Sequence, residues 1–242
     1  MRCYKLYIIW FLVGMILVGF DLIPSWLEWA NSVFLILAGC VAVGYAMETF
    51  GKKRGLIASI LIGVATFTIE GMSAHFDIFF GSYDYTNRFP PLLFGVPIGI
   101  GFAWIVMIMA GHALTLSFKT RLVKALVAAL YVVVLDLVLD PVAYVVKGYW
   151  LWDSESAYYG IPFSNFFGWF CIAFVVQLLL PRIKQLPSKQ SIHRMKMVFW
   201  TIVVLFIWIA LLAKLYMACI VAVISFSLLQ IGRRFYNGAK KT

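Results

Sequence analysis

Apolar stretches of about 20 residues recur along this whole chain, separated by short polar segments. A helix of about 20 apolar residues crosses the hydrocarbon core of a bilayer, since it rises about 1.5 Å per residue. Charged residues make up 12% of the chain, against roughly 25% in soluble domains. The pattern predicts an all-α, polytopic transmembrane helix bundle. No polar segment is long enough for a soluble domain, so we expect one integral membrane domain over residues 1–242.

About eight spans are predicted. Their expected ranges are about 5–21, 30–50, 56–78, 92–116, 122–146, 162–181, 197–212 and 215–232. The last two come from one apolar stretch, which as a single helix would be about 54 Å long and exceed a core of about 30 Å. We therefore expect a C-terminal helical hairpin over about 197–232 that turns at Ala213–Leu215, although neither Gly nor Pro marks the turn.

The basic residues favour eight spans with both termini in the cytoplasm. Of the 20 Lys and Arg residues, 17 lie in five clusters, at 2–5, 52–54, 119–124, 182–196 and 233–241. Eight spans put every cluster on one side, which the positive-inside rule makes cytoplasmic, whereas seven would put the last cluster outside. Loops beside anionic lipid account for the net charge of +10, so we expect no nucleic-acid partner. We expect a multi-pass protein of a bacterial plasma membrane.

Neither metal nor nucleotide binding is indicated. The four cysteines are scattered without a CxxC pair, and the three histidines form no HxxxH or ExxH pair. The glycine-containing stretch IGIGF, at 98–102, lies inside the fourth predicted span, where close helix packing explains it better than phosphate binding.

Two predicted spans contain buried acids. The stretch VLDLVLDP sets Asp136 and Asp140 four residues apart in the fifth span, and TFTIEGM sets Glu70 in the third. A charged side chain at the bilayer centre costs roughly 2.5–3.5 kcal/mol on insertion scales. Such a residue needs a partner, water or a proton. Pro141 follows Asp140 directly and predicts a kink beside the acid.

Helical rise predicts that these acids share one layer of the membrane. Glu70 and Asp136 each lie about 21 Å along an outward-running span, and Asp140 lies one turn further on the same helix face. We therefore predict an acidic patch in the outer half of the membrane, faced by Glu70. A purely structural role, joining helices through hydrogen bonds, is the alternative for each acid. His75, near the outer surface, is equally compatible with a structural role and with a proton shuttle.

An ordered set of motifs resembles a known family. Residues 70–91 read EGMSAHFDIFFGSYDYTNRFPP, followed by Val96–Pro97 and Trp104. Later motifs are DLVLDP at 136–141, YWLW at 149–152, YGIP at 159–162, and Asn165 with Gly168–Trp169. This order, over about residues 45–182, is similar to the CruF-type integral-membrane carotenoid hydratases, a bisanhydrobacterioruberin hydratase-like family of carotenoid biosynthesis.

The resemblance implies addition of water to the terminal double bond of an acyclic carotenoid ψ-end, giving a tertiary alcohol. Protonating such an alkene needs an acid that can form a tertiary carbocation, and a carboxyl group in low dielectric keeps its proton. We expect Asp136 or Asp140 as the acid and Glu70 as its partner, with the second carboxylate orienting and deprotonating the water.

Aromatic faces would stabilise the passing cation. The candidate substrate-binding residues are Tyr83, Tyr85, Trp150, Trp152 and Asn165. Hydration needs no redox cofactor, so none is expected, and the expected partners are a membrane-embedded carotenoid and the bilayer itself.

Other functions stay open at this point. A proton-coupled transporter would also carry intramembrane acids, although no inverted repeat is visible. A carotenoid cyclase would share the protonation step but lose a proton instead of adding water. A prenyl-transferring elongase should carry a DDxxD motif, which DLVLD matches weakly. A structural membrane protein would tolerate acid-to-amide changes.

Overall fold

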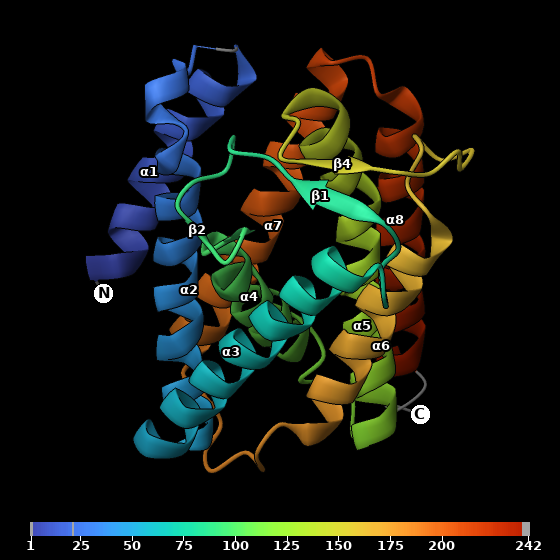
Figure 1. Ribbon diagram of the computed structural model, residues 1–242. Coiled ribbons are helices and arrows are strands. Elements are labelled where there is room, and N and C mark those ends of the chain that lie inside the picture. Colours follow the sequence, from blue (N-terminus) through green and yellow to red (C-terminus); the bar gives the residue numbers. More distant parts are fainter. Residues whose placement is uncertain (1, 21, 239–242) are drawn as a thin grey trace.

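The computed structural model describes residues 2–20 and 22–238, and within them the chain forms eight α-helices gathered in a bundle (Figure 1). The helices are α1 (Arg2–Gly19), α2 (Trp29–Phe50), α3 (Lys52–Phe76), α4 (Gly99–Leu114), α5 (Arg121–Pro141), α6 (Phe163–Leu179), α7 (Lys189–Leu212) and α8 (Tyr216–Gly238). A short 3-10 turn, Ser25–Leu27, lies between α1 and α2. The prediction of an all-α helix bundle is confirmed.

Six of these helices, α1, α2, α3, α5, α7 and α8, are long and apolar enough to cross a membrane. Helices α4 and α6 are shorter, with 16 and 17 residues, and also apolar. Helix α4 is enclosed by the others, since each of its residues except Phe102 is buried. The protein is therefore a membrane bundle built around one short central helix.

The C-terminal hairpin forms without Gly or Pro. Lys214 adopts a left-handed backbone with φ of 61° and ends α7. The Lys214 N–H donates to the Leu211 carbonyl at 3.1 Å, and the Leu215 N–H donates to the Ala210 carbonyl at 2.8 Å. This pair of bonds is the Schellman ending, which satisfies carbonyls that the helix leaves open. Helix α7 begins earlier than expected, at Lys189, because the Ser188 side chain accepts from Ser191 N at 3.1 Å.

The expected start of the fourth span, near residue 92, was wrong. Strands β2 (Leu92–Leu93) and β3 (Val96–Pro97) form a small hairpin there, and α4 begins at Gly99. The two turn residues, Phe94 and Gly95, both have positive φ, which favours a tight hairpin turn and ends a helix.

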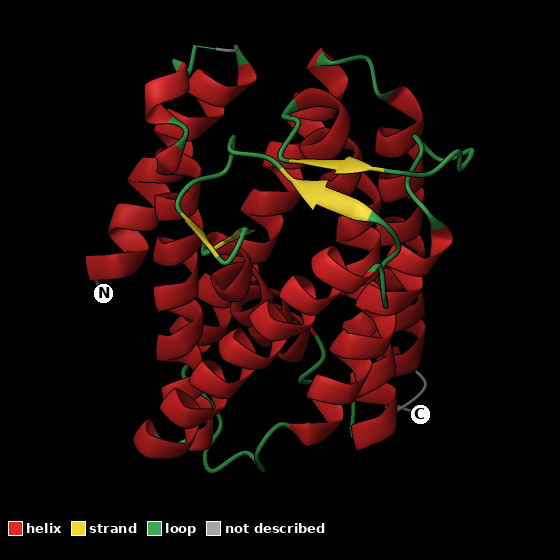
Figure 2. Cartoon of the chain, viewed as in Figure 1, coloured by secondary structure: helices red, strands yellow, loops and turns green. Residues whose placement is uncertain are grey.

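A second strand pair was expected only as loops. Strand β1 (Tyr83–Tyr85) pairs antiparallel with β4 (Trp150–Trp152) and lies across one end of the bundle (Figure 2). Helix α5 reaches this ribbon through Pro141 and a π-helical turn, Val142–Val146. A π-turn widens the helix locally, which fits the distortion that Pro141 predicted.

The connections α2–α3, α4–α5 and α6–α7 lie toward the lower end of Figure 1, where α8 also ends. Three basic clusters, at 52–54, 119–124 and 182–196, lie in these connections or in the helix ends beside them, so we name this the basic end and the opposite one the ribbon end. That the basic end is cytoplasmic stays a prediction from the positive-inside rule. Lys240 and Lys241 of the last basic cluster lie outside the described residues.

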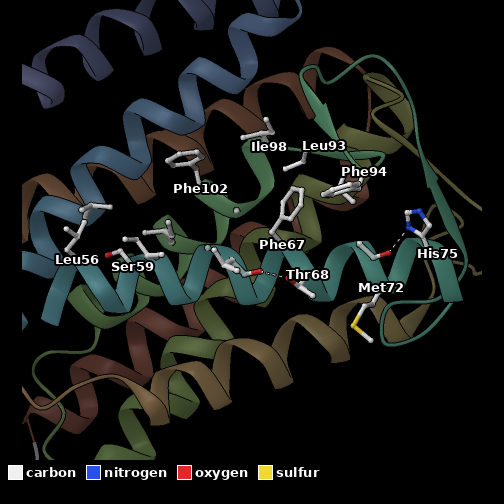
Figure 3. Close-up of a pocket in the computed structure, with 18 of the residues that line it drawn as sticks. Leu56, Ser59, Phe67, Thr68, Met72, His75, Leu93, Phe94, Ile98 and Phe102 are labelled. Carbon is white, nitrogen blue, oxygen red and sulfur yellow. Dashed lines mark hydrogen bonds between the residues drawn. The ribbon is translucent and has the colours of Figure 1, made fainter. Parts of the chain in front are cut away.

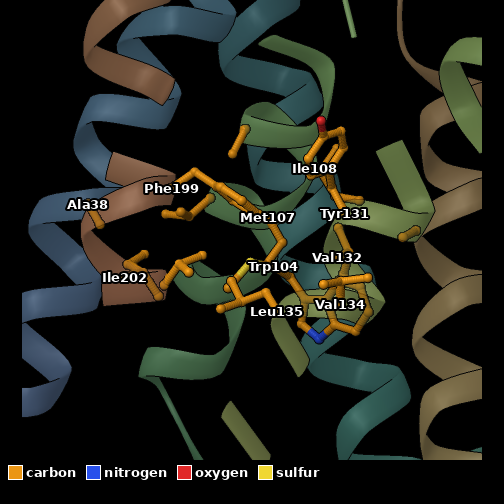
Figure 4. Packing of buried hydrophobic residues seen from close by; sticks show 14 of the residues in the cluster. Ala38, Trp104, Met107, Ile108, Tyr131, Val132, Val134, Leu135, Phe199 and Ile202 are labelled. Atoms are coloured by element: carbon orange, nitrogen blue, oxygen red, sulfur yellow. The ribbon is translucent and has the colours of Figure 1, made fainter. Parts of the chain in front are cut away.

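The core centres on α4. Trp104 and Met107 pack between Leu135 of α5 and Phe199 and Ile202 of α7 (Figure 4). Helices α3 and α4 approach closely at a pair of glycines: a Cβ added to Gly101 would lie 3.2 Å from the carbonyl oxygen of Gly63. The packing role predicted for the IGIGF stretch is confirmed at Gly101, because small residues let helix backbones approach.

Candidate functional site

The three carboxylates predicted to share a layer line one small cavity at the ribbon end. Glu70 comes from α3, and Asp136 and Asp140 come from adjacent turns of α5. Their side chains are almost fully enclosed, with 4%, 1% and 1% exposure in that order. We call these three residues the acid cluster. Each acid lies on the buried face of its helix, and the three line the same cavity, as the predicted acidic patch requires.

Glu70 accepts three hydrogen bonds from neutral donors. Tyr83 and Tyr85 donate from their hydroxyls to Oε2 at 2.8 and 3.0 Å. Trp104 donates from Nε1 to Oε1 at 3.0 Å. Burial raises the pKa of both phenols well above the usual value, and the neighbouring Glu70 carboxylate adds to the shift. Both tyrosines therefore keep the proton that they donate to Glu70.

The two aspartates are joined by one amide. Asn165, in the first turn of α6, donates from Nδ2 to Asp136 Oδ2 at 2.9 Å and to Asp140 Oδ2 at 2.7 Å. Trp150 and Trp152 donate from their indoles to Asp140 Oδ1 at 2.7 and 3.1 Å. Asp136 Oδ1 differs, because no side-chain hydrogen bond among residues 2–20 and 22–238 involves this oxygen.

The β1–β4 ribbon supplies four of these donors. Its register pairs Tyr83 with Trp152 and Tyr85 with Trp150, and the Tyr83 and Trp152 rings are 4.8 Å apart. Successive side chains of a strand alternate between its faces, so YDY and WLW each place two aromatic residues over the acids. Leu151 lies on the other face and is 54% exposed. We call Tyr83, Tyr85, Trp150 and Trp152 the aromatic roof.

The cavity enclosed by these groups has a volume of about 20 Å³. About 10–15 Å³ is enough for one water molecule, so the site admits a single water. All eight candidate catalytic and substrate-binding residues named from the sequence line it. These residues are Glu70, Tyr83, Tyr85, Asp136, Asp140, Trp150, Trp152 and Asn165.

Two tryptophans were missed as site residues. Trp104 donates to Glu70, and its ring stacks on Trp169 of α6 with centroids 4.5 Å apart. Trp169 also lines the cavity. Both belong to the ordered motifs in the sequence, and that membership was the signal that could have identified them.

His75 does not join the acid cluster. Its side chain is exposed, and Nδ1 lies 2.8 Å from the carbonyl oxygen of Gly71. It lines a separate apolar groove along α3, of about 760 Å³, bounded also by α4 and the β2–β3 hairpin (Figure 3). The groove runs from Leu56 to His75, about 28 Å by helical rise. Gly71 lines this groove while its neighbour Glu70 lines the small cavity.

Among residues 2–20 and 22–238, no group of three or more His, Cys, Asp or Glu side chains is placed to hold a metal ion. The acids are instead surrounded by phenol, indole and amide donors. Such an arrangement can hold and move protons beside a confined water.

The fold and this site define a class, an integral membrane helix bundle with buried carboxylates beneath an aromatic roof. Residues 30–231 match the family model of carotenoid biosynthesis proteins, and the chain belongs to that family. The resemblance predicted from the sequence motifs is thereby confirmed.

Among curated proteins, the chain is similar to the bisanhydrobacterioruberin hydratase of Haloarcula japonica, with 28% identity over 136 residues. That match covers 52% of this chain and 45% of the relative, so it spans less than half of the relative's length. No solved structure matches the chain.

Proposed function

We propose that this protein is a carotenoid hydratase that adds water to the terminal double bond of an acyclic carotenoid ψ-end. Family membership and the name of the Haloarcula relative support the pathway and the reaction class. The observation that carries the proposal is a cavity the size of one water, lined by three buried carboxylates under an aromatic roof. Hydration consumes one water, and the site provides room for one.

Asp136 is the proton donor in this proposal. Both oxygens of Glu70 and both oxygens of Asp140 accept hydrogen bonds from the surrounding side chains. Asp136 accepts at Oδ2 from Asn165, which leaves Oδ1 as the carboxyl oxygen available to hold a proton and donate it. This pattern supports Asp136, in preference to Asp140, as the acid in the proposal.

The reaction then balances in two steps. The proton on Asp136 Oδ1 adds to the less substituted alkene carbon, and the alkene electron pair forms the new C–H bond, leaving a tertiary cation. The water oxygen adds to the cation, and Glu70 accepts the released proton. Proton transfer from Glu70 to Asp136 within the cavity restores the starting state. The net change is one water added to the double bond.

The aromatic roof has two roles in this scheme. Its indole and phenol groups hold the Glu70 and Asp140 carboxylates in place. Its ring faces are electron-rich and stabilise the carbocation. A ψ-end is larger than a cavity of about 20 Å³, so we propose that roof side chains shift when the substrate enters.

The apolar groove along α3 is the proposed location of the polyene. Its length, about 28 Å, is close to the thickness of a bilayer core of about 30 Å. Its lining contains no Asp, Glu, Lys or Arg. One α3 turn contributes Gly71 to the groove and Glu70 to the acid cluster, so a substrate end passing the outer end of α3 would reach the acids.

We further propose that residues 1–242 form one multi-pass domain in a bacterial plasma membrane, with both termini and the basic end in the cytoplasm. The carotenoid end would then react in the outer half of the bilayer.

Pigment analysis tests the function. The chain is expressed in a bacterium engineered to make lycopene or a related acyclic carotenoid, and the pigments are separated and weighed by mass spectrometry. We expect a more polar pigment heavier by one water, lost in Asp136→Asn and retained in Asp84→Asn. Asp84 is the matched control, since it lies on the exposed side of the same ribbon. A pigment of unchanged mass would favour a cyclase, and no change with several ψ-end substrates would overturn the proposal.

A further inference from the structure

A second polar cavity lies at the basic end of the bundle, where α4 ends, α5 begins and α6 ends. Its volume is about 250 Å³. Four cationic side chains line it, and its lining contains no Asp or Glu. The cationic residues are Lys119, Arg121, Lys124 and Arg182. We call this cavity the basic pocket. Four like charges around one cavity repel each other, and a bound anion would relieve that repulsion.

Arg121 is held in a fixed position in this pocket. Its Nη2 donates to the carbonyl of Leu180 at 2.7 Å and also to that of Leu178, so the guanidinium closes the end of α6. An arginine carries five N–H donors. Both hydrogen bonds of Arg121 use Nη2, and in the part of the chain that the structure describes the N–H groups on Nη1 and Nε have no hydrogen-bond partner. A guanidinium fixed in this way is preorganised for a planar, bidentate contact with an oxyanion.

The start of α5 adds to the same field. Helix α5 is 21 residues long and begins at Arg121, and the Thr120 side chain makes no capping bond. The first N–H groups of a helix have no intrahelical partner and carry the positive end of the helix dipole, which favours an anion there.

A buried histidine is the independent observation that points to a ligand. His112 lines the pocket and is only 7% exposed. Its Nδ1 lies 2.9 Å from the Tyr45 hydroxyl, and within residues 2–20 and 22–238 no group bonds to Nε2. Gln177, 6% exposed, lies beside it with Nε2 donating to the Ile108 carbonyl at 2.6 Å. His112 lines the pocket, so Nε2 is the ring nitrogen left to hydrogen-bond with a group bound there.

We propose that the basic pocket binds a phosphate group. Phosphate oxygens suit both the arginine fork and the lysine ammonium groups, and the wall nearest the core offers the His112 imidazole and the Gln177 amide. Two sources share this chemistry: the headgroup of an anionic phospholipid in the adjacent leaflet, and a soluble phosphate. This inference does not depend on the proposed hydratase activity.

The test uses the full-length protein in lipid nanodiscs. The unfolding temperature is measured in phosphatidylcholine alone, with added phosphatidylglycerol, and with inorganic phosphate against chloride at equal ionic strength. The variant is Lys119→Gln with Lys124→Gln, and Arg182→Gln is a second, milder variant. The matched control is Lys52→Gln with Lys53→Gln, which removes two lysines from another connection at the same end. Native mass spectrometry counts the phosphatidylglycerol retained.

We expect one phosphate source to raise the unfolding temperature of the wild type and of the control variant. In the pocket variants, the affinity for that phosphate source should fall by about tenfold for each cation removed. Selective stabilisation by phosphatidylglycerol identifies a lipid headgroup, and stabilisation by inorganic phosphate identifies a soluble ligand. Equal stabilisation of the wild type and the pocket variants, or none by either source, overturns the proposal.

Discussion

Helix α5 carries a polar site at each end, and the two sites are built in opposite ways. At the ribbon end, Asp136 and Asp140 lie in a closed cavity of about 20 Å³ with neutral donors around them. At the basic end, Arg121 and Lys124 lie in an open pocket of about 250 Å³ whose lining contains no acid. The two ends are about 28 Å apart by helical rise.

The two ends of α5 differ in the groups that surround their charged side chains. Among the residues that the structure describes, the side chains that hydrogen-bond to the acids are neutral, so no ion pair neutralises the carboxylates. These neutral donors fix the positions of the carboxyl groups. They do not remove the capacity of those groups to exchange a proton. The bases at the other end lack fixed counter-charges, so they can accept an anion. Five variants test the ribbon-end half of this contrast and the groove that leads to it, beginning with the largest expected effect.

Exchanging the two aspartates for asparagine separates the acid from its neighbour. Asp136→Asn should slow pigment conversion by about 10²–10⁴, because it removes the proton that adds to the alkene. Asp140→Asn should lower the unfolding temperature more than Asp136→Asn does. Asp140 Oδ1 accepts hydrogen bonds from the indoles of Trp150 and Trp152, and asparagine offers them only an NH₂ group or a weaker acceptor. Conversion rates in membranes and melting of purified protein measure the two effects. A larger rate loss in Asp140→Asn would reverse the assignment of the acid.

Glu70→Gln is expected to affect both rate and stability. The amide cannot accept the proton of the attacking water, and its NH₂ would face either the Trp104 indole or the two tyrosine hydroxyls, which are donors. Leaving such a donor unpaired costs about 1–3 kcal/mol. Conversion should fall by at least about tenfold, with a lower unfolding temperature. Unchanged conversion would remove Glu70 from the mechanism.

Tyr85→Phe removes one of the three hydrogen bonds to Glu70 and should have a smaller effect, about 0.5–1.5 kcal/mol in stability. Because burial raises the pKa of Tyr85, its phenol stays protonated throughout the usual assay range. The alkaline limb of the pH–rate profile should therefore be the same in wild type and Tyr85→Phe. A limb that moves in the variant would mean that this phenol titrates during turnover.

Filling the groove tests where the polyene lies. Val64 faces the groove and is 61% exposed, so Val64→Trp would narrow it without touching the acids. We expect KM to rise by about threefold to tenfold while kcat stays near the wild-type value. The groove would bind the polyene equally in the ground state and in the transition state, so narrowing it weakens both to the same extent. The control is Val223→Trp on α8, where the valine is 51% exposed. Equal effects in both variants would argue against the groove.

Much of the site could be predicted from the sequence because its signals are local. Asp136 and Asp140 stand out in an apolar helix, and the rise per residue places Glu70 at their depth. The strand pairing of the roof was missed, because two three-residue segments carry too little periodicity to identify a strand. Trp104 was missed as a donor because an indole in an apolar span resembles any other core residue.

The early start of the fourth span was wrong for a similar reason. Residues 92–98 are apolar enough for a helix, yet Phe94 and Gly95 turn the backbone with positive φ. Hydropathy measures the free energy of transferring side chains to lipid, and it carries no information about the φ angles that the backbone adopts.

By itself, the sequence determined the membrane bundle, the number of helices, the C-terminal hairpin and the layer of the three acids. Each follows from hydropathy and helical rise, which act over one helix at a time. Tertiary structure decided which donor meets which carboxyl oxygen, why Asp136 Oδ1 stays open, and that the cavity has room for one water. These depend on contacts between segments far apart in the chain, such as Tyr83 with Trp152 and Asn165 with both aspartates. Packing sets such contacts to fractions of an ångström, and no local pattern encodes them.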